Sequence, residues 1–239
     1  MQIAIIGYGK MGQAIERAAL LRNHEVVLRI TTENIHELTK AHLQKADVAI
    51  EFTGPEAAAA NLVKCIDAGV NVVSGTTGWN DHLQRVQEYA LANGTGMLHA
   101  SNFSIGVNIF FEVNKLLAQL MNGHSEYDVF VDETHHVHKK DKPGGTAITL
   151  AEQIVERIKN RKGWALDGRP SDGIVPIHAA RSGEVPGTHQ VKYTSAIDDI
   201  EIIHTAHSRD GFALGAVLAA EFIAGKSGIF NMRDVLGIR

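Results

Sequence analysis

The sequence contains a single cysteine and no long hydrophobic run among its 239 residues. One cysteine excludes an intramolecular disulfide, and Cys65 lies in an alanine-rich helical run, which favours a small buried side chain over a reactive thiol. No stretch approaches the roughly 20 apolar residues needed to span a bilayer. The first residues, MQIAIIGYGKMG, lack the basic and long apolar segments of a signal peptide. We therefore expect a cytoplasmic protein with no membrane partner.

Positive charge is not in excess either. The 23 Lys and Arg residues are outnumbered by 27 Asp and Glu residues, and the formal net charge is −4. Because nucleic-acid-binding proteins usually carry a basic face, we expect no nucleic-acid partner. The 44% hydrophobic and 21% charged residues are typical of a globular protein with material for one large or two small domains.

The first hundred residues alternate apolar runs with helical patterns. Strands alternating with helices predict right-handed crossovers and a parallel sheet of the Rossmann type. Pro55 suits the first turn of a helix, and Asn80 is a plausible N-cap. The predicted strands are 3–6, 25–30, 47–52, 70–74 and 97–99, and the predicted helices are 13–21, 56–68 and 81–92, with a polar helix or loop at 33–45.

The pattern changes after residue 104. A helix at 105–121, a strand at 127–133 and a helix at 146–162 that stops at Gly163 precede three strands, at 174–179, 191–195 and 200–206. Strands without intervening helices predict an α+β domain with a mixed sheet at 105–210. A last helix at 212–224 is expected to return to the first domain, which would then comprise 1–104 and 211–239 and bind a dinucleotide.

A glycine-rich loop supports the dinucleotide prediction. Its G-x-G-x-x-G pattern follows a strand and opens a helix, the context in which the pattern is specific. The first glycine permits a tight turn, the second lets a pyrophosphate approach the backbone, and the third allows close packing of helix and strand. The loop consists of Gly7, Tyr8, Gly9, Lys10, Met11 and Gly12.

The choice between NADH and NADPH depends on the end of the second strand. An acidic residue there usually binds the ribose hydroxyls, but this place holds Thr31 and Thr32. The missing carboxylate removes a group that would repel a 2′-phosphate, and Lys10 and Arg29 are nearby cations. We expect NADPH to be accepted, while Glu33 leaves binding of NADH open.

Two further loops lie where predicted parallel strands end, which is where such sheets hold ligands. Both offer small residues and backbone groups suited to the nicotinamide end of the coenzyme, and residues 52–54 form a weaker third candidate. The expected contacts are Gly75, Thr76 and Thr77 in one loop and Ala100, Ser101, Asn102 and Phe103 in the other.

The segment 133–147, ETHHVHKKDKPGGTA, concentrates histidines and lysines between a predicted strand and a predicted helix. A zinc site is one reading, but no cysteine accompanies the histidines and the adjacent lysines would repel a cation. A solvated loop is a second reading. The third is a site that protonates an anionic substrate, because imidazole exchanges protons near neutral pH and a helix N-terminus binds anions. We favour the third and expect no metal.

This segment resembles the signature of the dihydrodipicolinate reductase family, E-x-H-H-x-x-K-x-D-x-P-S-G-T-A. The resemblance extends over most of the chain, through motifs in the same order. These motifs are GYGKMG at 7–12, SGTTG at 74–78, SNFSIGVN at 101–108 and RSGEVPGTH at 181–189. Two positions depart from the family pattern: Gly144 replaces the usual serine, and Thr31 stands where many members carry an acid.

The resemblance implies a function and a set of roles. His135 would be the acid–base residue and Lys139 a second proton donor, while His136, Gly145 and Thr146 would bind the carboxylates of a small dicarboxylate substrate. The family reduces 4-hydroxy-tetrahydrodipicolinate with NADH or NADPH in lysine and diaminopimelate biosynthesis, as a cytoplasmic homotetramer assembled through the second domain. An aspartate dehydrogenase-like oxidoreductase and a non-catalytic NAD(P)H sensor are the alternatives.

Overall fold

The computed structural model describes residues 1–169 and 173–238. The chain divides into two compact units, Met1–Ile105 with Asp210–Arg239, and Gly106–Arg209. Within the described residues, no helix has the combined length and apolar character that crossing a membrane requires.

The first unit alternates strands and helices and closes with the C-terminal elements. Its strands are β1 (Gln2–Ile6), β2 (Glu25–Ile30), β3 (Val48–Glu51), β4 (Asn71–Ser74), β5 (Gly96–His99) and β11 (Gly228–Phe230). Its helices are α1 (Lys10–Leu21), α2 (Lys40–Leu43), α3 (Pro55–Asp67), α4 (Asn80–Ala92), α7 (Asp210–Ile223) and α8 (Met232–Val235), with a 3-10 turn at Ile35–Glu37.

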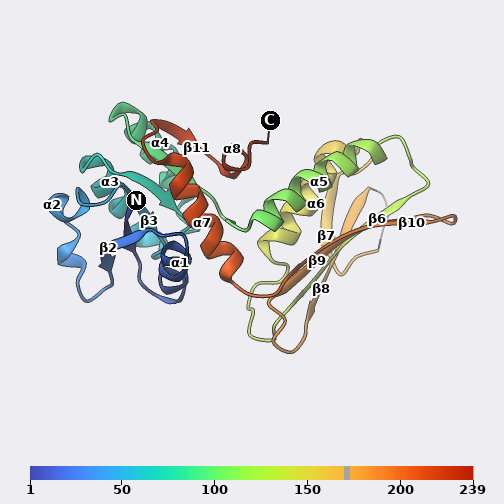
Figure 1. Ribbon diagram of the computed structural model, residues 1–239. Coiled ribbons are helices and arrows are strands. Elements are labelled where there is room, and N and C mark those ends of the chain that lie inside the picture. Colours follow the sequence, from blue (N-terminus) through green and yellow to red (C-terminus); the bar gives the residue numbers. More distant parts are fainter. Residues whose placement is uncertain (170–172, 239) are drawn as a thin grey trace. The chain divides into compact units, whose positions relative to one another are not determined.

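The strands of this unit form a six-stranded parallel sheet in the order β11-β5-β4-β3-β1-β2. Helices α1 and α7 cover one face and α3 and α4 the other (Figure 1). Every residue of β3 is buried, as expected for a parallel strand covered on both faces. The predicted Rossmann-type sheet is confirmed, and α7 packs against the same core as α1.

The second unit contains a separate sheet and two longer helices. Its elements are α5 (Ile105–Met121), β6 (Asp128–His135), α6 (Gly145–Arg157), β7 (Gly163–Leu166), β8 (Ile174–Arg181), β9 (Gly187–Thr194) and β10 (Asp199–Ala206). The strand order is β10-β9-β6-β8-β7, with β6 parallel to β8 and antiparallel to β9. Side chains of α5 and α6 share one core with β6, β8 and β9. The predicted mixed sheet is confirmed.

One predicted helix was too long. Helix α6 ends at Arg157 rather than at 162, because Ile158 takes extended backbone (φ −105°, ψ 109°). The side chain of Ile158 is buried in the core, so the apolar periodicity continued past the end of the helix. Gly163 does not stop a helix; it opens β7. The short strands β7 and β11, of four and three residues, were missed.

The predicted strand 127–133 ends too early. Strand β6 continues to His135, because Thr134 pairs with Thr188 of β9 and His135 pairs with Arg181 of β8. The pairing with His135 extends β8 to Arg181, and β9 starts at Gly187, which pairs with Ala206 of β10. The first histidine of the signature therefore lies on a strand and not on a loop.

Two helix starts also differ. Helix α1 begins at Lys10, directly after the glycine turn, rather than at 13. Asn80 is the first residue of α4 and not its N-cap, a position that Trp79 occupies. The buried Trp79 indole donates a hydrogen bond to the carbonyl of Thr76 at 2.7 Å, so packing and this bond fix the start of the helix.

Candidate active site

The glycine loop has the shape that a dinucleotide requires. Gly7 has φ +95°, and a Cβ there would lie 1.9 Å from the carbonyl oxygen of Phe52. A Cβ at Gly12 would lie 2.5 Å from the carbonyl oxygen of Gly7, so helix and turn touch. Gly9 faces open space and caps α1 without a side-chain hydrogen bond, which leaves first-turn N–H groups for an anion. The residues present fit a pyrophosphate.

Two pockets of about 520 and 240 Å³ lie over the carboxyl ends of β1, β3 and β4. Phe52 and Thr53 line both. Of the residues predicted to contact the coenzyme, the larger pocket is lined by Gly7, Tyr8 and Gly9 and the smaller by Met11, Gly75, Thr76 and Thr77. Lys10, Gly12 and Ala100 to Phe103 do not line these two pockets.

The cations near the expected ribose have different surroundings. Arg29 forms an ion pair with Glu16, which also accepts a hydrogen bond from Tyr8. The hydrogen bond from Arg29 lowers the pKa of Glu16. Because its charge is already paired, Arg29 is a poorer partner for a 2′-phosphate than the sequence suggests. Lys10 is exposed.

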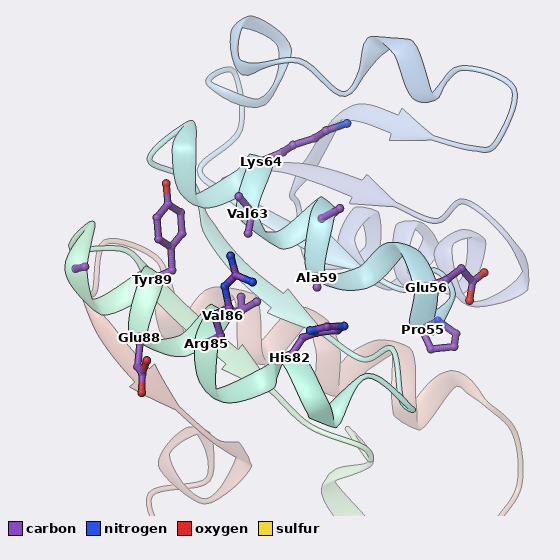
Figure 2. Close-up of a pocket in the computed structure, with 12 residues that line it drawn as sticks. Pro55, Glu56, Ala59, Val63, Lys64, His82, Arg85, Val86, Glu88 and Tyr89 are labelled. Carbon is purple, nitrogen blue, oxygen red and sulfur yellow. The ribbon is translucent and has the colours of Figure 1, made fainter.

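A wider hollow of about 990 Å³ lies between α3 and α4 (Figure 2). Ala59, Val63 and Val86 give it an apolar floor. Charged side chains of both signs surround this floor, among them Arg85 and Glu88. It gathers none of the residues predicted to react or to bind coenzyme. Size alone therefore does not mark the site.

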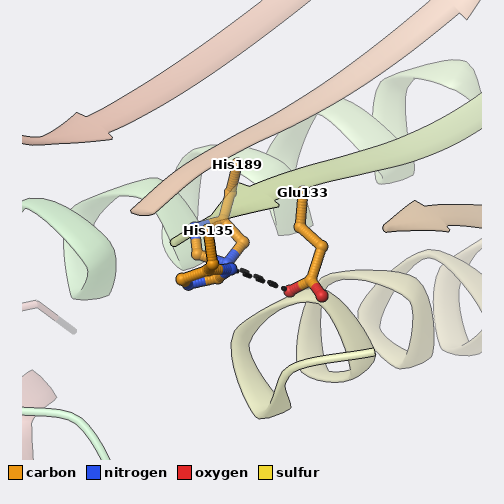
Figure 3. A group of neighbouring side chains, drawn as sticks. All are labelled: Glu133, His135 and His189. Carbon is orange, nitrogen blue, oxygen red and sulfur yellow. Dashed lines mark ion pairs between the residues drawn. The ribbon is translucent and has the colours of Figure 1, made fainter. Parts of the chain in front are cut away.

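In the second unit, Glu133, His135 and His189 form one cluster (Figure 3). Glu133 and His135 are two positions apart on β6 and project from the same face. His189 lies opposite Glu133 in the antiparallel pairing with β9. The rings of His135 and His189 meet edge to face, with centroids 5.0 Å apart. A Cβ at Gly187 would lie 3.0 Å from Nε2 of His135, so the glycine leaves room for that ring.

The Glu133 carboxylate is the centre of this cluster. It is 1% exposed and accepts hydrogen bonds from the backbone N–H of Gly144 (3.0 and 3.1 Å) and from Arg181 (3.0 Å). Nδ1 of His135 lies 3.5 Å and Nε2 of His189 3.8 Å from the same carboxylate, and neither nitrogen forms a hydrogen bond within the described residues. Because a buried charge is costly unless it is paired, these partners fix the carboxylate in place.

Burial shifts both histidines of the cluster towards the neutral form. It lowers the pKa of His135; Glu133 opposes this effect, while Lys139 and Arg181 add to it. Burial lowers the pKa of His189 to about 3, with the charges of His135, His204 and Lys139 acting in the same direction. A dianionic ligand beside His135 would favour its protonated form.

The N-terminus of α6 faces this region of the same unit. Gly144 is its N-cap, and among residues 1–169 and 173–238 no side chain bonds the first-turn N–H groups of Gly145 and Thr146. A Cβ at Gly144 would lie 2.7 Å from Oε2 of Glu133. Gly144 thus lets the backbone approach the carboxylate, while the next N–H groups stay available for an anion.

The remaining signature residues differ in exposure. Nζ of Lys139 lies 2.6 Å from Asp141, and this hydrogen bond lowers the pKa of the carboxyl group. His136 is half-buried. His138 is exposed and lies 3.3 Å from Glu184, so its surroundings are those of a surface side chain.

The cluster also resembles a metal site, because it combines one carboxylate with two imidazoles and their ligand atoms lie within 4.8 Å of one another. However, Gly144 and Arg181 already occupy the Glu133 carboxylate, and the guanidinium supplies a positive charge there. With Lys139 close by, a further cation would be repelled. The arrangement suits protonation and anion binding.

Sequence reasoning missed three residues of these sites. Arg181 and His189 were noticed only as the ends of the RSGEVPGTH motif, and they reach Glu133 through strand pairing. Glu51 ends β3 and is fully buried. Its signal was a carboxylate in the otherwise apolar segment 48–52.

Comparisons with known proteins agree over the whole chain. Residues 1–103 match the family described as dihydrodipicolinate reductase, N-terminus, and residues 106–236 its C-terminus. The chain is 50% identical to 4-hydroxy-tetrahydrodipicolinate reductase of Christiangramia forsetii, over 99% of this chain and 98% of that one. It is 41% identical to the Methanococcoides burtonii protein of that name, over 81% and 74%.

A solved structure shows the same likeness. Dipicolinate-bound dihydrodipicolinate reductase from Paenisporosarcina sp. TG-14 superposes with a TM-score of 0.81 at 25% identity, covering 97% of both chains. Two family matches, close relatives and this structure agree on one assignment. The chain belongs to the dihydrodipicolinate reductase family.

Proposed function

We propose that this chain reduces 4-hydroxy-tetrahydrodipicolinate to tetrahydrodipicolinate with NADH or NADPH, in lysine and diaminopimelate biosynthesis. The observation that carries the proposal is the buried Glu133–His135–His189 cluster beside the open N-terminus of α6. The other unit of the same chain has a glycine loop whose shape fits a pyrophosphate. We further propose that the two units are a coenzyme domain and a substrate domain.

The reaction replaces a hydroxyl group by hydrogen, so it consumes one hydride and one proton and releases water. The reduced coenzyme supplies the hydride when it is bound. The hydroxyl group leaves as water together with a proton from the neighbouring ring carbon, which gives a conjugated ring. Hydride addition to this ring leaves negative charge on it, and His135 donates the one proton that is consumed, with Lys139 as a second donor. General acid catalysis of this kind typically contributes about 10²–10⁴-fold.

The substrate's two carboxylates need positive or N–H partners. Gly145 and Thr146 offer backbone donors at the helix start, and His136 and Lys139 add side-chain donors. A bound carboxylate would compete with Asp141 for Lys139. The two negative charges of the bound substrate would also raise the pKa of His135, and the protonated imidazole could then donate its proton.

Replacement of His135 tests the proposal. In His135→Ala we expect turnover to fall by about 10²-fold or more, while the dissociation constant of the coenzyme, measured by fluorescence titration, stays unchanged. His138→Ala is the matched control, because His138 is exposed and lies outside the cluster. Near wild-type turnover in His135→Ala would exclude this role.

The substrate itself requires a separate assay. NADPH and NADH oxidation with the cyclic substrate is compared with NADH formation from L-aspartate. Turnover only with L-aspartate would overturn the proposed reaction in favour of an amino-acid dehydrogenase.

We also propose that the chain forms a cytoplasmic homotetramer through its second unit. Strand β10 lies at an edge of the five-stranded sheet, where backbone groups remain free to pair, and Ile203 on it is 57% exposed. Size-exclusion chromatography with light scattering measures the mass of the protein in solution. A monomer at micromolar concentration would contradict the proposed tetramer.

A further inference from the structure

A carboxylate is buried in the first unit where water cannot reach it. Glu51 ends β3 and is 0% exposed, between Ile6 of β1 and Ser74 of β4 in the sheet register. A buried carboxylate is costly unless hydrogen bonds replace its water shell. Its partners therefore indicate why it is there.

Within the described part of the chain, the hydrogen-bond partners of the Glu51 side chain come from the ends of β3 and β4 and the loops that follow them. Oε2 accepts from the hydroxyl of Ser74 at 2.7 Å. Oε1 accepts from the hydroxyl of Thr76 at 2.7 Å, from the backbone N–H of Thr53 at 3.0 Å and from the hydroxyl of Thr53. The carbonyl of Glu51 accepts from the N–H of Gly75 at 2.9 Å. One side chain thus ties two loops to the sheet.

The two loops are also tied to each other. The N–H of Thr53 donates to the hydroxyl of Thr76 at 2.8 Å, while that hydroxyl donates to Glu51. Thr53 and Thr76 both line the smaller of the two pockets at the carboxyl ends of the strands. The shape of that pocket therefore depends on a group beneath it that does not line it.

We propose that Glu51 is a positioning residue for the coenzyme: it holds the Thr53 and Thr76 loops in the shape that receives the nicotinamide half. This inference rests on the proposed function, because it assumes that NAD(P)H binds over this sheet edge. A carboxylate is suited to the task because it only accepts hydrogen bonds, and one oxygen can serve several donors.

The test is Glu51→Gln, which keeps the shape and one acceptor oxygen but removes the charge. Hydrogen bonds to charged groups are stronger than neutral ones. We expect the coenzyme dissociation constant to rise about tenfold, a loss within the range for one charged hydrogen bond. Hydrogen exchange of the coenzyme-free protein should speed up at residues 52–54 and 75–77. The dissociation constant of dipicolinate, which tests the second unit, should not change.

Asn71→Ala is the matched control. The Asn71 side chain makes three hydrogen bonds at the amino end of β4: it donates to the carbonyls of Ile223 and Lys226 and accepts from the N–H of Gly96. If both variants lose coenzyme affinity in parallel with thermal stability, Glu51 is merely structural and the inference is overturned. Unchanged affinity and exchange in Glu51→Gln overturn it too. A wild-type protein that binds no NAD(P)H overturns the proposed function, and this inference with it.

Discussion

The sharpest prediction concerns acid stability and His189. The residue is 5% exposed, and burial lowers its pKa from 6.5 to about 3. Between these values the unfolded chain binds a proton that the folded chain does not, so the free energy of unfolding falls as pH falls below 6.5. The slope is about 1.4 kcal/mol per pH unit, and moving from pH 7.5 to 5.0 therefore costs about 2 kcal/mol at this residue.

The perturbation is His189→Gln, which removes the titrating group and keeps a polar side chain of similar length. Urea unfolding at pH 7.5 and 5.0 gives the free energy of unfolding at each pH. Trp79 and Trp164 lie in different units, so a Trp79→Phe background leaves a fluorescence signal from the second unit alone. We expect wild type to lose about 2 kcal/mol more than His189→Gln on acidification.

Partly buried histidines make the comparison with wild type necessary. Burial also lowers the pKa values of His99, His135 and His204, so wild type has further losses of the same sign. These losses remain in the variant and cancel in the difference. His138→Gln, at an exposed site, should behave as wild type. Equal acid sensitivity of wild type and His189→Gln, with unchanged urea dependence, would refute the argument.

Gly144 and Glu16 allow two further tests. Gly144→Ala places a Cβ 2.7 Å from the fixed Glu133 carboxylate. Overpacking of this kind should lower the free energy of unfolding by about 1–3 kcal/mol, and an unchanged urea midpoint would contradict this prediction. Glu16→Gln removes the charge paired with Arg29, which leaves Arg29 able to pair with the 2′-phosphate of NADPH. The KM for NADPH should therefore fall about threefold or more relative to the KM for NADH at low salt. An unchanged ratio of the two KM values would show that Arg29 does not meet the 2′-phosphate.

The first unit was predictable because its signals are local. A glycine loop, a proline at the first turn of α3 and continuous apolar runs each predict structure within a few residues. Strand β2 has the predicted bounds, at 25–30, and helix α5 of the second unit also has its predicted bounds, at 105–121. Family resemblance added the reaction, which these local patterns do not specify.

The contacts of the candidate site were harder to predict from the sequence. His189 meets Glu133 only through the pairing of β9 with β6, across 55 intervening residues, and Arg181 through the pairing with β8. Strand register depends on turns and on the packing of the whole face, which a single sequence does not display. For the same reason the sequence suggested Arg29 as a free cation, whereas folding pairs it with Glu16 across 12 intervening residues.

The position of β6 between a parallel and an antiparallel neighbour has a consequence for how this family can diverge. Substitutions and length changes in the turn between β8 and β9 are absorbed outside the sheet. One residue inserted within β9 ahead of His189 would instead turn that side chain to the opposite face. Two inserted residues would restore its face but move it along the strand by roughly 7 Å. Point mutation can therefore explore this strand, whereas insertions and deletions there are expected to be eliminated.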